Sequence, residues 1–189
     1  MKFVYHMVPK KMIGDELLPL NYIKGLDNEL YKQYSEKYRN SPERESLLQR
    51  KIPKLDCLWN DVIFLLPLHP NYIFKSLSEL GVRIKKDLLF YEIPIERLHD
   101  NLNAIYYYRK SNYKGPSSDI PEVEVEIIQI DSLHMLNAIP EDTLTYFTEE
   151  SKKGTNFGMF AYIPHVLSLG KIDISGVNYV NWSKESIGK

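Results

Sequence analysis

At 189 residues, with 43% hydrophobic and 26% charged residues, the chain has the composition of a globular protein that buries a sizeable core. Its formal net charge of -1 excludes a global basic field that would attract nucleic acid or anionic lipid. The single cysteine, Cys57, excludes an internal disulfide framework and a cysteine-rich zinc module. We therefore expect one α+β domain over residues 1–189.

The first residues and the apolar runs do not have the pattern of an export signal or a membrane span. No apolar run near the start is followed by a small-residue cleavage site, and no segment reaches the roughly 20 apolar residues that a bilayer requires. We expect a cytoplasmic protein with no membrane partner.

The chain opens with a predicted strand and continues into helices. Residues 2–8 form a short β-prone run that carries Tyr5 and His6 and ends at a proline. After a loop over residues 10–20, the charged segments 28–39 and 42–51 predict two helices, because apolar residues recur at helical spacing in the first and a Ser-Pro pair begins the second. Basic residues between Lys32 and Lys54 make this region locally positive.

The densest apolar run, residues 62–66, lies at the centre of the stretch from Pro53 to Pro70 and predicts a strand buried on both faces. Asn60, Asp61 and His69 flank this strand, where a buried scaffold would hold polar groups still for a small molecule. They are equally explained as residues that cap the strand and the helix predicted over 70–80.

Further strands are predicted over residues 87–94, 102–108, 159–166 and 171–182. Between them lie a polar loop over 109–121, a helical turn within 142–150 and the segment 122–130. The strict alternation of 122–130 predicts a strand with Glu122, Glu124 and Glu126 together on its solvent face. The tyrosines at 106–108 indicate half-buried surface or walls that stack on a ligand.

Well-marked nucleotide and hydrolase motifs are absent from the sequence. It contains no Walker loop, no G-x-G-x-x-G, no G-x-S-x-G and no H-E-x-x-H. Histidines and Cys57 lack the close spacing of zinc ligands, so no metal site is expected. Cys57 lies beside Asp56, which disfavours a thiolate, and is expected to be structural.

Three short motifs resemble the ADP-ribosyltransferase family. They are Tyr5-His6 on the first strand, Tyr91 within the middle strand LLFYEIP, and Glu122-x-Glu124 at the start of a strand after a polar loop. The resemblance implies a split, mostly antiparallel sheet with flanking helices and a cleft between the first strand and the central stretch. It also implies NAD as substrate.

Roles follow from the same resemblance. His6 would hold the ribose of NAD, and Tyr5 beside it would also contact the cofactor. Tyr91 would lie beside the nicotinamide, and Glu122 or Glu124 would be the catalytic carboxylate that stabilises the developing oxocarbenium charge. Asn60 is a further candidate for binding the cofactor. The acceptor would be a nucleic acid held by the basic helices or a protein side chain, as in a toxin or a phage-defence component.

Two alternatives remain open at the level of the sequence. One is a non-catalytic domain that binds a nucleotide or a partner protein in the same cleft. The other is a hydrolase or nuclease that uses Asp61, His69 and a further carboxylate.

Overall fold

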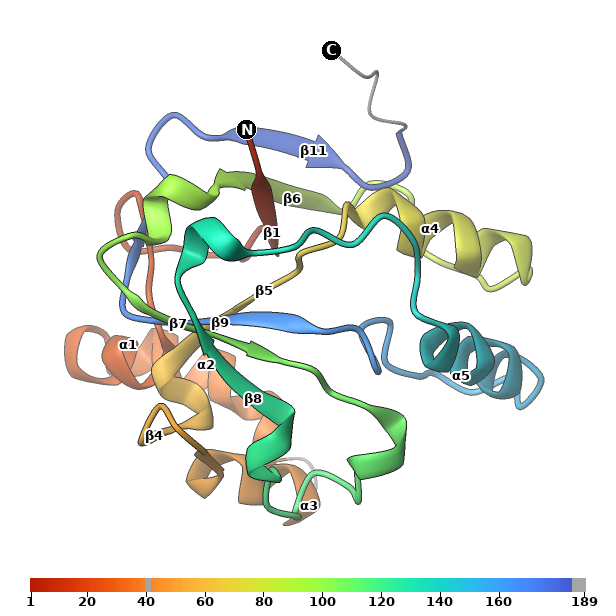
Figure 1. The fold of residues 1–189 in the computed structure, drawn as a ribbon, viewed down its shortest axis with the longest axis horizontal. Helices are drawn as coiled ribbons and strands as arrows, with labels where there is room; N and C mark the ends of the chain where they lie inside the picture. Colours follow the sequence, from red (N-terminus) through yellow and green to blue (C-terminus); the bar gives the residue numbers. More distant parts are fainter. Residues whose placement is uncertain (40–41, 185–189) are drawn as a thin grey trace.

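Two antiparallel sheets with helices packed around them make up the fold (Figure 1). A computed structural model describes residues 1–39 and 42–184. The α-helices of this described part are α1 (Leu20–Leu26), α2 (Asn28–Arg39), α3 (Pro42–Glu45), α4 (Pro70–Glu79) and α5 (Glu141–Ser151). The architecture is α+β, as the sequence predicts.

The strands fall into two main sheets and two small ladders. The three-stranded sheet has the order β1 (Phe3–Met7), β6 (Leu89–Pro94), β11 (Asn178–Asn181). The four-stranded sheet has the order β5 (Val62–Leu65), β9 (His165–Leu169), β7 (Leu102–Tyr106), β8 (Val125–Ile128). The small ladders pair β2 (Glu16–Leu17) with β10 (Ile172–Asp173) and β3 (Lys51–Ile52) with β4 (Cys57–Leu58). Neighbouring strands in both main sheets are antiparallel.

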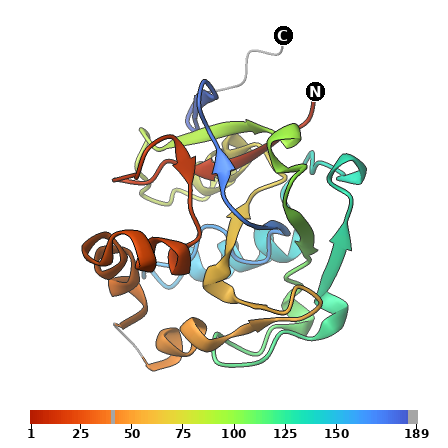
Figure 2. The same cartoon turned by 90° about the vertical axis from the view of Figure 1, so that its left-hand side faces the viewer.

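The two main sheets meet where β1 passes the end of β5. The amide of Tyr5 donates to the Leu66 carbonyl at 3.0 Å, and the amide of Leu66 donates to the Tyr5 carbonyl at 2.9 Å. Figure 2 shows β1 (dark red) and β5 (gold) running in different directions from this junction. The predicted mostly antiparallel strands with flanking helices are therefore confirmed, and they are divided into two main sheets joined at the Tyr5–Leu66 pair.

β5 is buried on both faces, as predicted. Ile63 and Leu65 pack against Val4 and Val166 in one core cluster, whereas Val62 belongs to a second cluster on the opposite face. Leu65 has no exposed surface, and burying such a side chain contributes about 1.5–3 kcal/mol to folding.

Local signals explain the helices on either side of β5. α2 has the predicted bounds and buries Leu30 and Tyr38 on one stripe. α4 begins at Pro70, and Nδ1 of His69 accepts the Asn71 amide at 3.2 Å, so His69 caps the helix. The predicted helix over 42–51 is shorter, because α3 passes into a 3-10 helix over Ser46–Gln49.

The single strand predicted over residues 122–130 is wrong in its first third. Glu122–Glu124 form a 3-10 turn after Pro121, and β8 begins only at Val125. Val123 is 66% exposed while Glu124 is 2% exposed, so Glu124 does not lie on a solvent face. The turn directs its carboxylate towards polar partners on a neighbouring loop, which outweigh the alternating pattern.

The strand predicted over 159–166 is also displaced. The strand starts at His165 and continues to Leu169, so it lies later in the chain than predicted. Pro164 lacks the amide that a strand ladder needs, which fits a strand that begins after it. The predicted helical turn is the longer helix α5, and the last predicted strand is divided into β10 and β11.

Candidate ligand site

β7 ends in three consecutive tyrosines at one corner of the four-stranded sheet. Tyr106 is buried, and Tyr107 and Tyr108 are half-buried. Residues two apart in an extended chain face the same side, and the rings of Tyr106 and Tyr108 stack with centroids 5.1 Å apart and planes at 19°. This side of the sheet therefore carries an aromatic surface at the end of β7.

Four tyrosines, Tyr106, Tyr108, Tyr113 and Tyr162, form what we call the tyrosine cluster. The Tyr108 ring lies 5.2 Å from both Tyr113 and Tyr162, which are 6.0 Å from each other. Burial raises the pKa of Tyr106 to about 12 and raises that of Tyr108 further. The phenols therefore stay protonated at neutral pH and remain hydrogen-bond donors.

Backbone strain marks the same place. Tyr108 has φ of 53° and Tyr162 has φ of 61°, a left-handed conformation that bulky residues rarely adopt. Such conformations persist only where the surrounding structure holds them, and they gather at ligand sites. Two strained tyrosines whose rings touch thus single out this corner of the molecule.

A pocket of about 350 Å³ opens beside the cluster. Its lining residues come from the end of β7, the start of α5 and the segment before β9: Tyr107, Arg109, Pro140, Glu141, Asp142, Tyr162 and Pro164. This volume lies within the usual range for small-molecule pockets.

Glu124 supports the pocket from behind by holding Arg109. Its carboxylate accepts the Arg109 amide at 2.8 Å, the Arg109 guanidinium at 2.9 Å and the Asn112 side-chain amide at 2.7 Å. Burial alone would raise the pKa of Glu124, but the hydrogen bonds from Asn112 and Arg109 outweigh it and lower the pKa. Both carboxylate oxygens are engaged, so Glu124 fixes the loop after β7.

The pocket is acidic once this ion pair is counted. Glu124 balances the charge of Arg109, whose guanidinium lies 4.3 Å from the centre of the Tyr107 ring. The exposed carboxylates of Glu141 and Asp142 remain without a balancing charge in a pocket that Tyr107 and Tyr162 also line. Asp142 accepts the Lys110 amide at 3.3 Å, which ties α5 to the loop. A site with aromatic faces and unbalanced carboxylates favours a cationic aromatic ligand.

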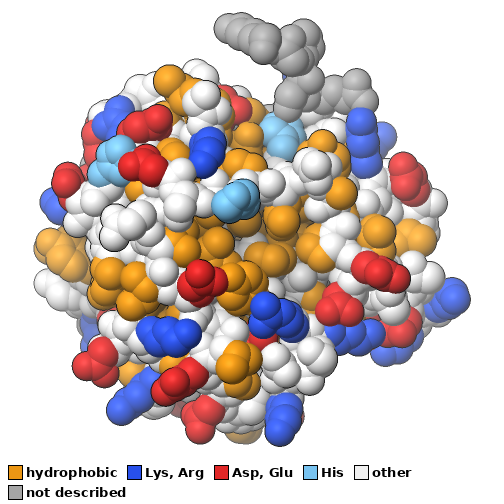
Figure 3. All heavy atoms as spheres, in the orientation of Figure 1, with side chains coloured by type: hydrophobic (Ala, Val, Ile, Leu, Met, Phe, Trp, Pro, Cys, Tyr) orange, Lys and Arg blue, Asp and Glu red, His pale blue; other side chains and the backbone are white. Residues whose placement is uncertain are grey.

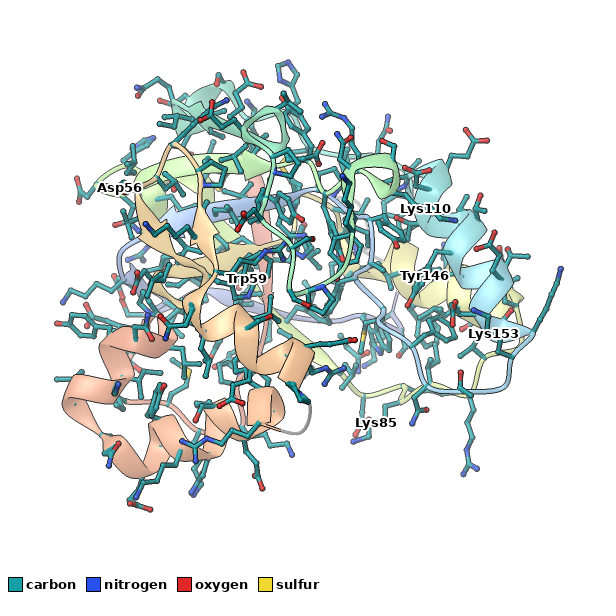
Figure 4. The ribbon with its side chains drawn as sticks, turned by 90° about the horizontal axis from the view of Figure 1, so that it is seen from below. Asp56, Trp59, Lys85, Lys110, Tyr146 and Lys153 are labelled. Carbon is teal, nitrogen blue, oxygen red and sulfur yellow. The ribbon has the colours of Figure 1, made fainter. Side chains whose placement is uncertain are left out.

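Two residues that border the tyrosine cluster, Trp59 and Tyr146, can be followed in Figure 4. Figure 3 shows hydrophobic side chains in a band across the middle of the molecule, with acidic and basic side chains along its lower border. In Figure 4, seen from below, Trp59 lies near the middle and Tyr146 lies beside α5 (cyan). Both residues contact the tyrosine cluster. The ring centroids of Trp59 and Tyr106 are 6.0 Å apart, and those of Tyr146 and Tyr162 are 5.3 Å apart.

His165, the first residue of β9, borders the cluster from within the sheet. Its ring lies 6.5 Å from Tyr108 and 6.1 Å from Phe64, and its Nδ1 is 2.7 Å from the Ile163 carbonyl. Burial lowers the pKa of His165 to about 4, although the Ile163 carbonyl opposes the shift. The imidazole is therefore neutral at physiological pH, and its Nδ1 donates to Ile163.

The residues predicted to bind NAD on the first strand lie in a different environment. His6 and Tyr91 are neighbours in the β1–β6 register, whereas Tyr5 projects from the other face of β1 and packs against His69 at 5.1 Å. Burial lowers the pKa of His6 to about 4, with the Met7 backbone partly offsetting it, and Nδ1 of His6 is buried without a hydrogen-bond partner.

The polar residues around β5 have structural contacts. Asp61 accepts the Leu58 amide at 2.7 Å and the Asn21 side chain at 2.7 Å. Asn60 is 4% exposed, and its side-chain nitrogen has no hydrogen-bond partner. Of the predicted residues on this stretch, Asn60 alone keeps a free buried polar atom.

The predicted glutamates and the predicted histidine are not brought together. His6 lies on β1 in the three-stranded sheet, whereas Glu122 and Glu124 precede β8, the edge strand of the four-stranded sheet. Glu122 is exposed, and Glu124 is engaged with Arg109.

Most of the residues that line the pocket could not be predicted from the sequence. Tyr107, Arg109, Glu141, Asp142 and Tyr162 come from segments whose contact no local pattern predicts. The run of tyrosines at 106–108 was the one available signal.

Comparison with known proteins adds no family. No protein-family model, curated protein or solved structure matches the chain. Over residues 1–39 and 42–184, no helix combines the length and apolar character that a membrane crossing needs. In the same residues, no three His, Cys, Asp or Glu side chains gather in a way that could hold a metal ion.

Proposed function

We propose that the protein binds NAD as a substrate and acts as an ADP-ribosyltransferase-like enzyme, with the nicotinamide ring in the pocket between Tyr107 and Tyr162. The observation that carries this proposal is the combination of tyrosine walls and two unbalanced carboxylates in one pocket. The nicotinamide ring of NAD⁺ is aromatic and positively charged, so it matches both properties.

The charge of the pocket predicts different affinities for the oxidised and the reduced dinucleotide. The ring of NADH is neutral, and a cation–π contact contributes about 0.5–2 kcal/mol. NAD⁺ should therefore bind about tenfold more tightly than NADH. A pocket that recognises only the adenine or the phosphates would not make this distinction.

The same carboxylates suit glycosidic cleavage. When the bond between nicotinamide and ribose breaks, its electron pair leaves with nicotinamide and positive charge develops on the ribose. Glu141 and Asp142 line the pocket and would stabilise that charge, while the acceptor forms the new bond and loses its proton. Glu124 then acts as a positioning residue, because it holds Arg109 in place.

The split sheet gives the proposal secondary support. The resemblance implied a cleft between the first strand and the central stretch, and at this place β1 and β5 belong to different sheets joined at the Tyr5–Leu66 pair. His6 lies on β1 with a free buried Nδ1. The proposal gives His6 no contact with the nicotinamide ring. The acceptor is a nucleic acid or a protein side chain, as a toxin or phage-defence component would use.

A non-catalytic nucleotide-binding domain is the second candidate. It is favoured by the full engagement of the Glu124 carboxylate and by the exposure of Glu122, which leave neither predicted glutamate facing the pocket. This candidate shares the pocket and the preference for NAD⁺ but predicts no bond cleavage.

Titration calorimetry with NAD⁺ and NADH tests the pocket. We expect the roughly tenfold preference for NAD⁺ in the native protein, and its loss when Glu141→Gln and Asp142→Asn are combined. Glu96→Gln, an exposed glutamate on another turn, is the matched control and should keep the preference. Equal affinities in the native protein would refute the assignment of the ring to this pocket.

Release of free nicotinamide from NAD⁺, with cell extract supplying acceptors, tests catalysis. The enzyme proposal expects release that the double variant reduces at least 100-fold, because a stabilising carboxylate contributes that much to a transition state. Tight NAD⁺ binding without nicotinamide release would favour the non-catalytic candidate.

A further inference from the structure

Arg50 is a buried cation without a balancing charge. It lies directly after the 3-10 helix Ser46–Gln49 and is 7% exposed. Its Nε has no hydrogen-bond partner, and within residues 1–39 and 42–184 no Asp or Glu forms an ion pair with it. A buried charge is normally paired, because removing it from water is expensive.

Aromatic rings fix the position of Arg50 beside the tyrosine cluster. Its guanidinium carbon lies 5.1 Å from the centre of the Trp59 ring, and the Trp59 amide donates to the Arg50 carbonyl at 2.7 Å. Its charge also acts on the Tyr106 hydroxyl, where it favours the ionised form. Arg50 therefore lies beside Tyr106, whereas the pocket carboxylates lie beside Tyr162, and both tyrosines belong to the tyrosine cluster.

More positive charge approaches from α2. Lys37 lies 4.9 Å over the ring of Tyr38, whose hydroxyl is beside the indole of Trp59. Although Lys37 is at the surface, the protein around it and the charge of Arg44 lower its pKa. Two cations, Arg50 and Lys37, thus lie against aromatic rings in the region around Trp59.

We propose that Arg50 and the Tyr106 hydroxyl form a binding site for a phosphate group. A phosphate supplies the balancing negative charge that Arg50 lacks and an acceptor oxygen for its unpartnered Nε. Arginine is suited to phosphate because its planar fork binds two oxygens at once. The assignment of that phosphate to the diphosphate of NAD rests on the proposed function. The order of charges agrees with it, since a cationic ring at the acidic pocket would be followed by anionic phosphates towards Arg50.

A purely structural Arg50 predicts different behaviour. If its stacking on Trp59 serves only stability, its replacement should lower the melting temperature and leave anion binding unchanged. If Arg50 instead binds a phosphate, its unpaired charge should destabilise the ligand-free protein. The apolar, similarly sized Met in Arg50→Met should then leave the melting temperature equal or higher in anion-free buffer.

Thermal unfolding with and without inorganic pyrophosphate separates these roles. We expect pyrophosphate to raise the melting temperature of the native protein by several degrees at millimolar concentration, and Arg50→Met to abolish the rise. Arg50→Lys keeps the charge without the planar fork and should weaken binding at least tenfold. The control is Arg83→Gln, an exposed arginine, which should behave as the native protein does.

Either of two results overturns the proposal: no response of the native protein to pyrophosphate, or an equal response in Arg50→Met. Its failure is distinguishable from failure of the proposed function. Pyrophosphate binding without any preference for NAD⁺ over NADH would keep the phosphate site and reject the nicotinamide pocket. The opposite result is NAD⁺ binding that pyrophosphate does not inhibit and that Arg50→Met does not weaken. It would keep the nicotinamide pocket and reject the phosphate site.

Discussion

Two buried charges at the borders of the tyrosine cluster differ in how they are satisfied. Glu124 is 2% exposed and accepts three hydrogen bonds from Arg109 and Asn112. Arg50 is 7% exposed, is stacked on Trp59 and has an unpartnered Nε. A satisfied buried charge stabilises the fold around it, whereas an unsatisfied one keeps capacity for a ligand. We therefore assign structure to the first and binding to the second.

The largest expected change in stability comes from removing the buried carboxylate of Glu124. Glu124→Ala should lower the free energy of unfolding by about 3 kcal/mol, because the Arg109 loop loses three hydrogen bonds to a charged group. Glu124→Gln keeps part of this network and should lose less. Urea denaturation of the purified variants measures both. A loss below about 1 kcal/mol in Glu124→Ala would remove the distinction from Arg50.

An intermediate effect concerns His165, a buried group that the cluster keeps neutral. Its native pKa of about 4 lies below the ordinary value near 6.5, so the unfolded chain binds a proton at higher pH than the native chain does. Stability is therefore retained above about pH 6.5 and falls as the pH drops towards 4. Between pH 7 and 5 the loss from His165 should be about 2 kcal/mol, and His6 acts in the same direction.

Unfolding at both pH values tests this expectation. His165→Phe removes the titrating ring, so its stability should change less between pH 7 and 5 than that of the native protein. His99→Gln is the control, because His99 is exposed and Asp131 raises its pKa. An unchanged pH dependence in His165→Phe would show that the imidazole is not held neutral.

The smallest expected effect comes two residues before Glu124. Glu122 is exposed in the same 3-10 turn, and Glu122→Ala should change the free energy of unfolding by less than about 0.5 kcal/mol. The pair of variants then compares the same substitution in one turn with and without buried partners. Similar losses at both positions would mean that the turn itself, and not the Arg109 contact, determines stability.

The sequence predicted the elements whose cause is local. An apolar run bounded by prolines gave β5, and an apolar stripe with a Pro-led successor gave α2 and α3. The strand predicted over residues 122–124 was wrong because the cause of their conformation is not local. Their alternation is typical of a strand, but Arg109 and Asn112 offer Glu124 partners that lie more than ten residues away. A polar contact between distant segments is invisible to periodicity.

The candidate site follows the same division. Tyr106 to Tyr108 stood out as a run of one residue type. Tyr107 lines the pocket, and Tyr106 and Tyr108 belong to the tyrosine cluster beside it. Glu141 and Asp142 form the first turn of α5, where acidic residues are common in any helix. Only the fold brings that turn to the end of β7. The motifs that suggested NAD binding by His6 and Tyr91 lie in the three-stranded sheet, whereas the pocket lies at the end of β7 in the four-stranded sheet.

The strand order also constrains how the molecule assembles. β9, close to the end of the described chain, lies between β5 and β7, which are not paired with each other. On a ribosome, the hydrogen-bonding edges of β5 and β7 that face β9 would stay open until residues 165–169 emerge, long after both strands have been synthesised. Closure of this gap over some hundred residues implies slow folding and a period of susceptibility to aggregation.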